Sequence, residues 1–290
     1  MTLPRPFLLI RLIPAFLIVG VAVLGMVAIL KRVNKVFPFD KSIALTLLAS
    51  LLTALAAHVS YILYVRWVEG RSATELSARG APAELGAGIL IGTGLCTLVI
   101  GAIWALGSYR VNGVNPPIVV IPLLGTALIA GYVEEILLRG IAFRILEEAL
   151  GTWWAFLLSA LIFGLLHARN PNATVIGTLA IASSAGLVLG AAYVLTRRLW
   201  FPIGIHLAWN FVQGGVFGVS VSGQRVRGLL QGELSGAEPV SGGSFGIEAS
   251  VFVVVFGLAL TVAFLWLASR NGHLVLPVWK QRSTWSQALP

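Results

Sequence analysis

The chain has 290 residues, of which 58% are hydrophobic and only 11% are charged, and its mean hydropathy is +0.92. A soluble domain carries about 25% charged residues, so this composition excludes an ordinary soluble protein. The net charge of +9 does not indicate nucleic-acid binding, because the basic residues are scattered through short segments where they anchor and orient membrane helices.

Eight uncharged runs follow one another along the chain, and each is close to or above the ~18 residues that suggest a membrane-spanning helix. In chain order they are Leu12–Leu30, Ser42–Val65, Leu85–Tyr109, Val111–Val133, Ala149–Leu166, Asn172–Thr196, Leu199–Gln224 and Ala249–Ser269. The pattern predicts an all-α, polytopic helical membrane protein with about eight transmembrane helices.

The segments between the runs are short and show no second folded domain. The first run is expected to be a retained helix, because it lacks a convincing small-residue cleavage site and is followed by Lys31, Arg32 and Lys35. The longest connection, 219–248, is rich in Gly and Ser and is expected to be either a flexible loop or a segment folded back toward the bundle. The single cysteine, Cys96, excludes an intrachain disulfide framework and a multi-cysteine metal site.

Ionisable side chains inside the apolar runs are functional candidates, since such groups usually face the bundle interior or a watery cavity. GYVEEILLRG (131–140), at the end of the fourth run, carries Glu134, Glu135 and Arg139. Glu135 and Arg139 are four residues apart on one helical face and are expected to pair, which is a structural role. Glu134 lies about 100° around the helix from its neighbour and is left free to exchange protons.

Three polar residues of later runs join this set. His167 ends the fifth run, where a lone histidine is usually an interfacial polar residue. His206 and Asn210 are four apart in the seventh run, where they either hydrogen-bond to a neighbouring helix or direct two donors at one oxyanion. His58 has no polar companion at helical spacing and His273 lies beyond the last run, so both are expected to be structural.

Together these side chains indicate a hydrolytic site in a polar cavity formed by the fourth, fifth and seventh runs. Either Glu134 activates water directly, or Glu134, His167 and His206 bind one divalent metal such as zinc, and spacing does not decide between these. We favour the metal-free role for His206, because its pairing with Asn210 aims both groups at one oxygen. The chain lacks an H-E-x-x-H motif, and its only aspartate, Asp40, lies in a loop, which excludes the usual zinc-protease helix and an aspartyl dyad.

The three motifs resemble those of the CPBP family, the CAAX proteases and bacteriocin-processing enzymes, also called the Abi family. EEILLR (134–139) resembles its E-E-x-x-x-R motif, FGLLH (163–167) its F-x-x-x-H motif, and HLAWN (206–210) its H-x-x-x-N motif. All three stand in the family's order, and the resemblance covers about residues 115–215. It implies an intramembrane metallo- or glutamate-dependent endopeptidase, similar to type II CAAX prenyl endopeptidases.

The resemblance also implies the role of each site residue. Glu134 would be the catalytic glutamate that activates water, with help from His167. His206 and Asn210 would stabilise the oxyanion, while the ion pair of the first motif would organise the site. The implied cofactor is one divalent metal or none, and the implied substrate is a membrane-associated protein or peptide, with CAAX-type C-terminal processing as one form.

On this basis we expect four segments: N-terminal transmembrane helices without a motif (1–110), a catalytic core (111–218), the Gly/Ser-rich loop (219–248), and the last transmembrane helix with its tail (249–290). The expected location is the cell membrane of a bacterium or archaeon, with the lipid bilayer as a partner. One alternative is a non-catalytic immunity or regulatory protein that keeps the polar cluster for packing. The other is a proton-coupled transporter, which paired broken half-helices would favour; the sequence shows none.

Overall fold

The computed structural model describes residues 9–36 and 42–280, so Asp40 lies outside the described residues. Its main elements are α1 (Leu12–Val36), α2 (Ile43–Trp67), α3 (Ala81–Ala105), β1 (Tyr109–Val114), α4 (Ile121–Ile129), α5 (Arg144–Leu150), α6 (Thr152–His167), α7 (Val175–Ile181), α8 (Leu187–Thr196), α9 (Trp200–Asn210), β2 (Leu230–Leu234), α10 (Glu238–Ser241) and α11 (Val251–Arg270). Six helices of the described part are long and apolar enough to cross a membrane, and α6 is apolar but shorter. The predicted all-α, polytopic class is confirmed.

π-helical turns interrupt the long helices at four places. They join α4 to α5 in one helix over Pro117–Leu150, join α7 to α8 in another over Val175–Thr196, and extend α9 at its C-terminal end. The π-helical segments are Ala130–Glu134, Ile136–Phe143, Ala182–Gly186 and Phe211–Val216. Such turns often lie at functional sites. The first two contain nearly all of the EEILLR motif, which therefore lies in the middle of the joined α4–α5 helix.

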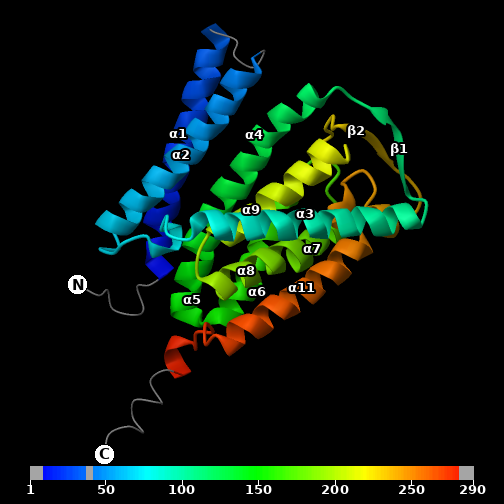
Figure 1. The fold of residues 1–290 in the computed structure, drawn as a ribbon. Coiled ribbons are helices and arrows are strands. Elements are labelled where there is room, and N and C mark those ends of the chain that lie inside the picture. The colour runs from blue at the N-terminus through cyan, green and yellow to red at the C-terminus, as the bar shows by residue number, and fades with distance from the viewer. Residues whose placement is uncertain (1–8, 37–41, 281–290) are drawn as a thin grey trace, which may run out of the picture.

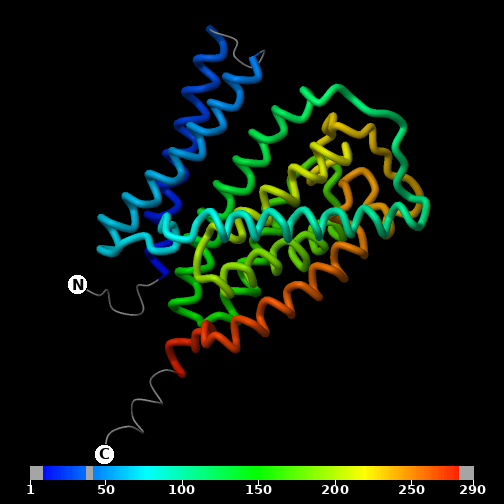
Figure 2. Tube along the Cα trace, in the orientation of Figure 1, coloured from blue at the N-terminus to red at the C-terminus, as the bar shows by residue number. Residues whose placement is uncertain are grey.

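α1 and α2 form a pair that projects from the rest of the molecule, while α3 lies across the body against α9 (Figures 1 and 2). Glycines make the α3–α9 contact unusually close. A Cβ atom added at Gly88 would lie 2.3 Å from the carbonyl oxygen of Phe201, and one added at Gly92 would lie 2.4 Å from that of Ile205. Small residues let helix backbones touch in this way inside membranes, where dispersion and shape hold helices together. The contact fixes the position of α9, which carries His206.

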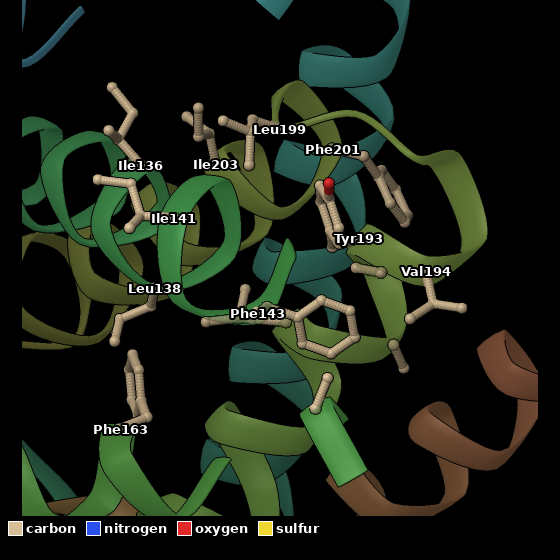
Figure 3. Close-up of a cluster of buried hydrophobic side chains, with 14 of the residues drawn as sticks. Ile136, Leu138, Ile141, Phe143, Phe163, Tyr193, Val194, Leu199, Phe201 and Ile203 are labelled. Atoms are coloured by element: carbon tan, nitrogen blue, oxygen red, sulfur yellow. The ribbon is translucent and has the colours of Figure 1, made fainter. Parts of the chain in front are cut away.

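The main apolar core lies among the α4–α5 helix, α6, α8 and the start of α9 (Figure 3). Its large buried side chains come from all four elements and include Ile136, Ile141, Phe143, Phe163, Tyr193, Val194, Leu199 and Ile203. Lipid tails are as apolar as these side chains, so close packing rather than loss of water contact drives their association. This core holds the three motif-bearing helices in one fixed arrangement.

The start of the fourth predicted run is wrong, because Tyr109–Val114 forms strand β1 rather than a helix. α3 ends earlier than the third run predicts, and Gly107 follows it with φ of 71°, a conformation that stops a helix. β1 pairs antiparallel with β2, with Tyr109 opposite Leu234. The partner strand lies more than a hundred residues away in sequence, so the local pattern gives no sign of this pairing.

The end of the fourth predicted run is also wrong, because the helix continues to Leu150. Most of its charged side chains are paired, which offsets part of the cost of placing charge in an apolar segment. Arg139 pairs with Glu135 at 2.8 Å, and Glu147 pairs with Arg197 of the segment after α8 at 2.5 Å. The seventh predicted run corresponds to α9 and its π-helical extension, and this helix ends earlier than predicted, at Val216. The segment that follows folds back against the bundle and contains β2 and α10, which settles the two options for 219–248.

Candidate active site

Glu134 and Glu135 lie where two π-helical segments meet, beside the backbone of α9. Gly131 makes this approach possible. A Cβ atom at Gly131 would lie 2.7 Å from the backbone nitrogen of Leu207, so any side chain there would push the two helices apart. The glycine and the π-helical turns together bring the glutamates next to His206, which precedes Leu207 on α9.

Glu135 and Arg139 form the pair expected from their spacing. Arg139 Nη1 donates to Glu135 Oε1 at 2.8 Å, and both side chains are completely buried. Arg139 Nη2 donates to the carbonyl oxygen of Gly186 at 3.0 Å, and its guanidinium lies 4.9 Å from the ring centroid of Phe163. The pair therefore ties the α4–α5 helix to the α7–α8 helix and to α6.

His206 lies between the two glutamates. Its Nδ1 is 2.9 Å from Glu135 Oε1, and its Nε2 is 4.0 Å from Glu134 Oε2. A carboxylate only accepts hydrogen bonds, so Nδ1 carries the proton in this contact and Nε2 is the atom available for chemistry. His206 is buried, whereas 36% of the Glu134 side chain is exposed. Glu135 thus orients the imidazole, and Glu134 is the carboxylate within reach of solvent.

His167 and Phe163 complete one side of the site. His167 Nδ1 is 2.8 Å from the carbonyl oxygen of Phe163, so it donates there and leaves Nε2 available. The Phe163 ring packs against both imidazoles, with centroid distances of 4.7 Å to His167 and 5.8 Å to His206. Gly164 lets α6 approach α7 closely, since a Cβ atom there would lie 2.7 Å from the carbonyl oxygen of Thr178.

His167, His206 and Asn210 line one narrow cavity, in which the centres of water-sized molecules can occupy about 40 Å³. Most of the remaining lining is apolar and comes from α3, α6, the α7–α8 helix, α9 and α11. Glu134 is not part of this lining and reaches the site through its approach to His206. The structure therefore gathers three of the four expected catalytic residues around the cavity and places the fourth beside one of them.

Sequence reasoning missed a second polar group in the same cavity, which we call the Glu248 cluster: Gln213, Ser222 and Glu248. Glu248 is buried, and its burial raises the pKa of the carboxyl to about 7. It accepts hydrogen bonds from the backbone nitrogen and hydroxyl of Ser222 at 2.9 and 3.0 Å, and from Gln213 Nε2 at 2.6 Å. Its only sequence signal is an acidic residue in a Gly-rich stretch directly before the last apolar run.

The two histidines expected to be structural make contacts of that kind. His58 Nδ1 lies 2.6 Å from the hydroxyl of Tyr132, and His273 Nδ1 lies 2.8 Å from the carbonyl oxygen of Leu195. Tyr132 stands in the π-helical turn just before Glu134, so His58 links α2 to the segment that presents the glutamates.

The residues do not assemble a metal site of the expected composition. Among residues 9–36 and 42–280, no three His, Cys, Asp or Glu side chains come close enough together to hold a metal ion. A catalytic zinc site needs three protein ligands at about 2.0–2.2 Å from one point, and this arrangement does not supply them.

Comparison with known proteins supports the resemblance drawn from the motifs. Residues 116–212 match the family of type II CAAX prenyl endopeptidase Rce1-like proteins. The chain is also 28% identical over 123 residues to a Bacillus subtilis (strain 168) protein named "Putative membrane peptidase YdiL". That alignment covers 42% of this chain and 46% of the relative, so the chain matches about half the length of the relative. No solved structure gives a significant match. The match confirms the resemblance to the CAAX protease family over the segment that contains all three motifs.

Proposed function

We propose that this integral membrane protein is an endopeptidase that hydrolyses a peptide bond of a membrane-associated protein or peptide. The observation that supports it most directly is the position of His206, held by buried Glu135 on one nitrogen and facing partly exposed Glu134 with the other. Ionisable groups that hold one another in place beside a cavity are typical of catalytic sites. The likeness to a family of CAAX proteases supports the same class of reaction.

In the proposed mechanism, Glu134 is the general base. Its carboxylate takes a proton from a water molecule while the water oxygen forms a bond to the carbonyl carbon of the substrate. His167 Nε2 helps to hold that water, since Nδ1 is engaged with the backbone. The proton on Glu134 then passes to the nitrogen of the leaving amine as the C–N bond breaks, which returns the carboxylate to its starting form.

The oxyanion of the tetrahedral intermediate is stabilised by hydrogen bonds from Asn210 and His206. The Asn210 side-chain amide donates directly. His206 Nδ1 donates to Glu135, so Nε2 donates to the oxyanion once the ring has taken up a second proton from solvent, and it keeps that proton through the reaction. Arg139 balances the buried charge of Glu135 and keeps that carboxylate in place. Two preorganised donors of this kind typically contribute a large share of catalysis in acyl transfer.

The substrate proposal is a peptide with an apolar segment. Most of the cavity lining is apolar, which suits a transmembrane or lipid-modified segment next to the scissile bond. CAAX-type C-terminal processing is the form suggested by the matched family. We also propose a bacterial cell membrane as the location, which the bacterial relative supports.

The experiment that tests the function compares Glu134→Gln with the wild-type protein. Protein termini in membranes from cells expressing each form are sequenced by mass spectrometry, and the candidate substrates are then incubated with purified protein. We expect Glu134→Gln to lower the cleavage rate about 10²–10⁴-fold, as the loss of a general base does, and to unfold at the wild-type temperature. Glu238→Gln removes an exposed carboxylate from the 219–248 segment and serves as the matched control.

Two outcomes would contradict the proposal. Undiminished cleavage by Glu134→Gln would remove Glu134 from the mechanism. No cleavage difference in cells, together with no hydrolysis by purified wild-type protein, would favour the non-catalytic or transporter alternatives for the same polar cluster.

A further inference from the structure

The Glu248 cluster holds a buried carboxylate that no positive charge balances. Glu248 lies in a 3₁₀ turn directly before α11, and its side chain is almost completely buried. In the described part of the chain, its hydrogen bonds come from Ser222 and Gln213, and no Lys, Arg or His side chain pairs with it. Buried carboxylates are rarely left without a cation, since an unpaired buried charge is expensive. The other glutamates with buried side chains in the described part of the chain each pair with an arginine; they are Glu69, Glu75, Glu135 and Glu147.

The hydrogen-bonding capacity that remains in the cluster consists of acceptors. Both donors of Ser222 go to Glu248, and the Gln213 amide nitrogen donates to Glu248 and to the carbonyl oxygen of Ser220 at 2.6 Å. Gln213 Oε1 is buried and has no hydrogen-bond partner among the described residues. A carboxylate has about four acceptor positions, of which Glu248 uses three. With Glu248 ionised, the cluster can therefore bind another donor but offers nothing to another acceptor.

The turn that carries Ser222 is rigidly held. Ser222 and Gly223 both have positive φ, 46° and 83°, and a Cβ atom at Gly223 would lie 1.8 Å from the carbonyl oxygen of Pro171. The amides of Asn170 and Asn172 donate to the carbonyl oxygens of Ser222 and Gly223 at 3.0 and 3.3 Å. The cluster is thus built in advance, and a ligand would not have to order it.

The cluster opens into the cavity of the candidate active site. Glu248 and Ser222 line the same cavity as His167, His206 and Asn210, with apolar side chains such as Val188 in the lining. A peptide that places its scissile bond at His206 therefore has a second polar contact region inside the same cavity, separate from the catalytic residues.

We propose that Glu248 is a specificity-determining residue that binds a cationic side chain, Lys or Arg, of the substrate peptide. The inference rests on the proposed function in one respect, that the occupant of the cavity is the substrate. An ammonium or guanidinium group supplies both the positive charge and the donors that the cluster lacks. A carboxyl with a pKa near 7 ionises readily when such a cation arrives, so the free protein can keep the group buried at low cost.

Binding of synthetic peptides to the Glu134→Gln protein in detergent micelles tests the proposal without requiring hydrolysis. The probes are fluorescent peptides with one Leu/Ala-rich segment and a single Lys moved along it, matched by peptides with norleucine or acetyl-lysine at that position. We expect one Lys position to bind about tenfold or more tightly than both matched peptides, because a charge-assisted hydrogen bond is gained. Adding Glu248→Gln should reduce that preference to about onefold, while adding Glu238→Gln should leave it unchanged.

Each result decides the question. Equal affinity for the Lys, norleucine and acetyl-lysine peptides at every position would overturn the proposal, and the acetyl-lysine comparison needs no substitution at Glu248. A Lys preference that survives Glu248→Gln would also overturn it. The proposed function is tested separately. A Glu248-dependent preference for Lys without hydrolysis by the wild-type protein would contradict the peptidase function and support the cation site. Hydrolysis without the preference would support the peptidase function and contradict the cation site.

Discussion

Two buried polar clusters use similar side chains and differ in whether any hydrogen-bonding capacity is left over. The first, which we call the charge cluster, lies between α2, α3 and α5 and consists of Tyr61, Glu69, Arg71, Glu75 and Arg144. Arg144 pairs with Glu69 at 2.7 Å, and Arg71 reaches both Glu69 and Glu75 at 2.8 Å. Tyr61 donates to Glu75 and lies 3.0 Å from the carbonyl oxygen of Gly140. No buried side-chain atom of this cluster lacks a partner among the described residues.

The second region, around the cavity, is left incomplete. Glu135 Oε2, Arg139 Nε and Gln213 Oε1 are buried and have no hydrogen-bond partner among residues 9–36 and 42–280. Within the part of the chain that the structure describes, Glu248 has no basic side chain paired with it. Native interiors satisfy most buried polar groups, so these three unpaired atoms near His206 and Glu248 indicate a site for a ligand or for water. Two further buried hydroxyls of the described residues lack a partner, those of Ser159 in α6 and Thr261 in α11, and neither lines the cavity. We therefore expect the closed charge cluster to serve stability alone, and the open region around the cavity to carry the proposed activity as well.

The largest effect is expected from breaking the buried pair of Glu135 and Arg139, which lies beside His206 and also ties three helices together. Glu135→Ala strands buried Arg139 and should lower the free energy of unfolding by about 3–5 kcal/mol, in addition to abolishing cleavage. Thermal unfolding in detergent, measured beside Glu134→Gln, checks this. Equal unfolding temperatures for Glu135→Ala and Glu134→Gln would mean that we have assigned the wrong roles to the two glutamates.

Arg144→Met tests the role of the charge cluster, in which all buried side-chain atoms of the described residues have partners. It removes one of the basic partners of Glu69 from a fully satisfied cluster and should lower the free energy of unfolding by about 3 kcal/mol. Because the charge cluster does not touch the cavity, kcat/KM of the protein that remains folded should equal that of wild type. Stability is measured by denaturant titration and activity below the unfolding transition; a folded but inactive Arg144→Met would contradict the distinction between the clusters.

Glu248, in the region around the cavity, should make the free energy of unfolding depend on pH. Burial raises the pKa of Glu248 from 4.5 to about 7, so the folded state binds this proton more strongly than the unfolded state. The resulting stabilisation is fully present below about pH 4.5 and is lost as the pH rises through about 7, a change of about 3 kcal/mol. The difference in stability between wild type and Glu248→Gln should therefore shift by that amount over this range. A constant difference from pH 4.5 to pH 8 would contradict the raised pKa.

The smallest expected effect concerns metal. The proposed mechanism relies on Glu134, His167, His206 and Asn210 alone, so exhaustive chelation should change activity by less than about twofold. Metal content of the purified protein is measured alongside. Stoichiometric metal that disappears in His206→Ala, with zinc restoring activity to the chelated wild-type protein, would replace this proposal with a metal-dependent one.

The sequence by itself determined the class of the protein and the local part of the site. Long apolar runs require helices in a bilayer, since the backbone must satisfy its own hydrogen bonds there. The spacing of Glu135 and Arg139 determined their pairing, because residues four apart share a helical face. The order of the three motifs was enough to predict the resemblance to the CAAX protease family, and residues 116–212 match a model of Rce1-like proteins of that kind.

Which polar groups meet across the bundle depends on tertiary packing and could not be predicted from the sequence. The contact of His206 with Glu135 joins residues 71 positions apart, and the contact of Glu248 with Gln213 joins residues 35 apart. β1 and β2 likewise pair across a long stretch of sequence, with Tyr109 opposite Leu234. Sequence periodicity reports the face of one helix, whereas these contacts depend on how helices pack, through close approaches such as that of Gly131 to Leu207. For that reason the three motifs could be predicted from the sequence, and the acceptor-rich Glu248 cluster could not.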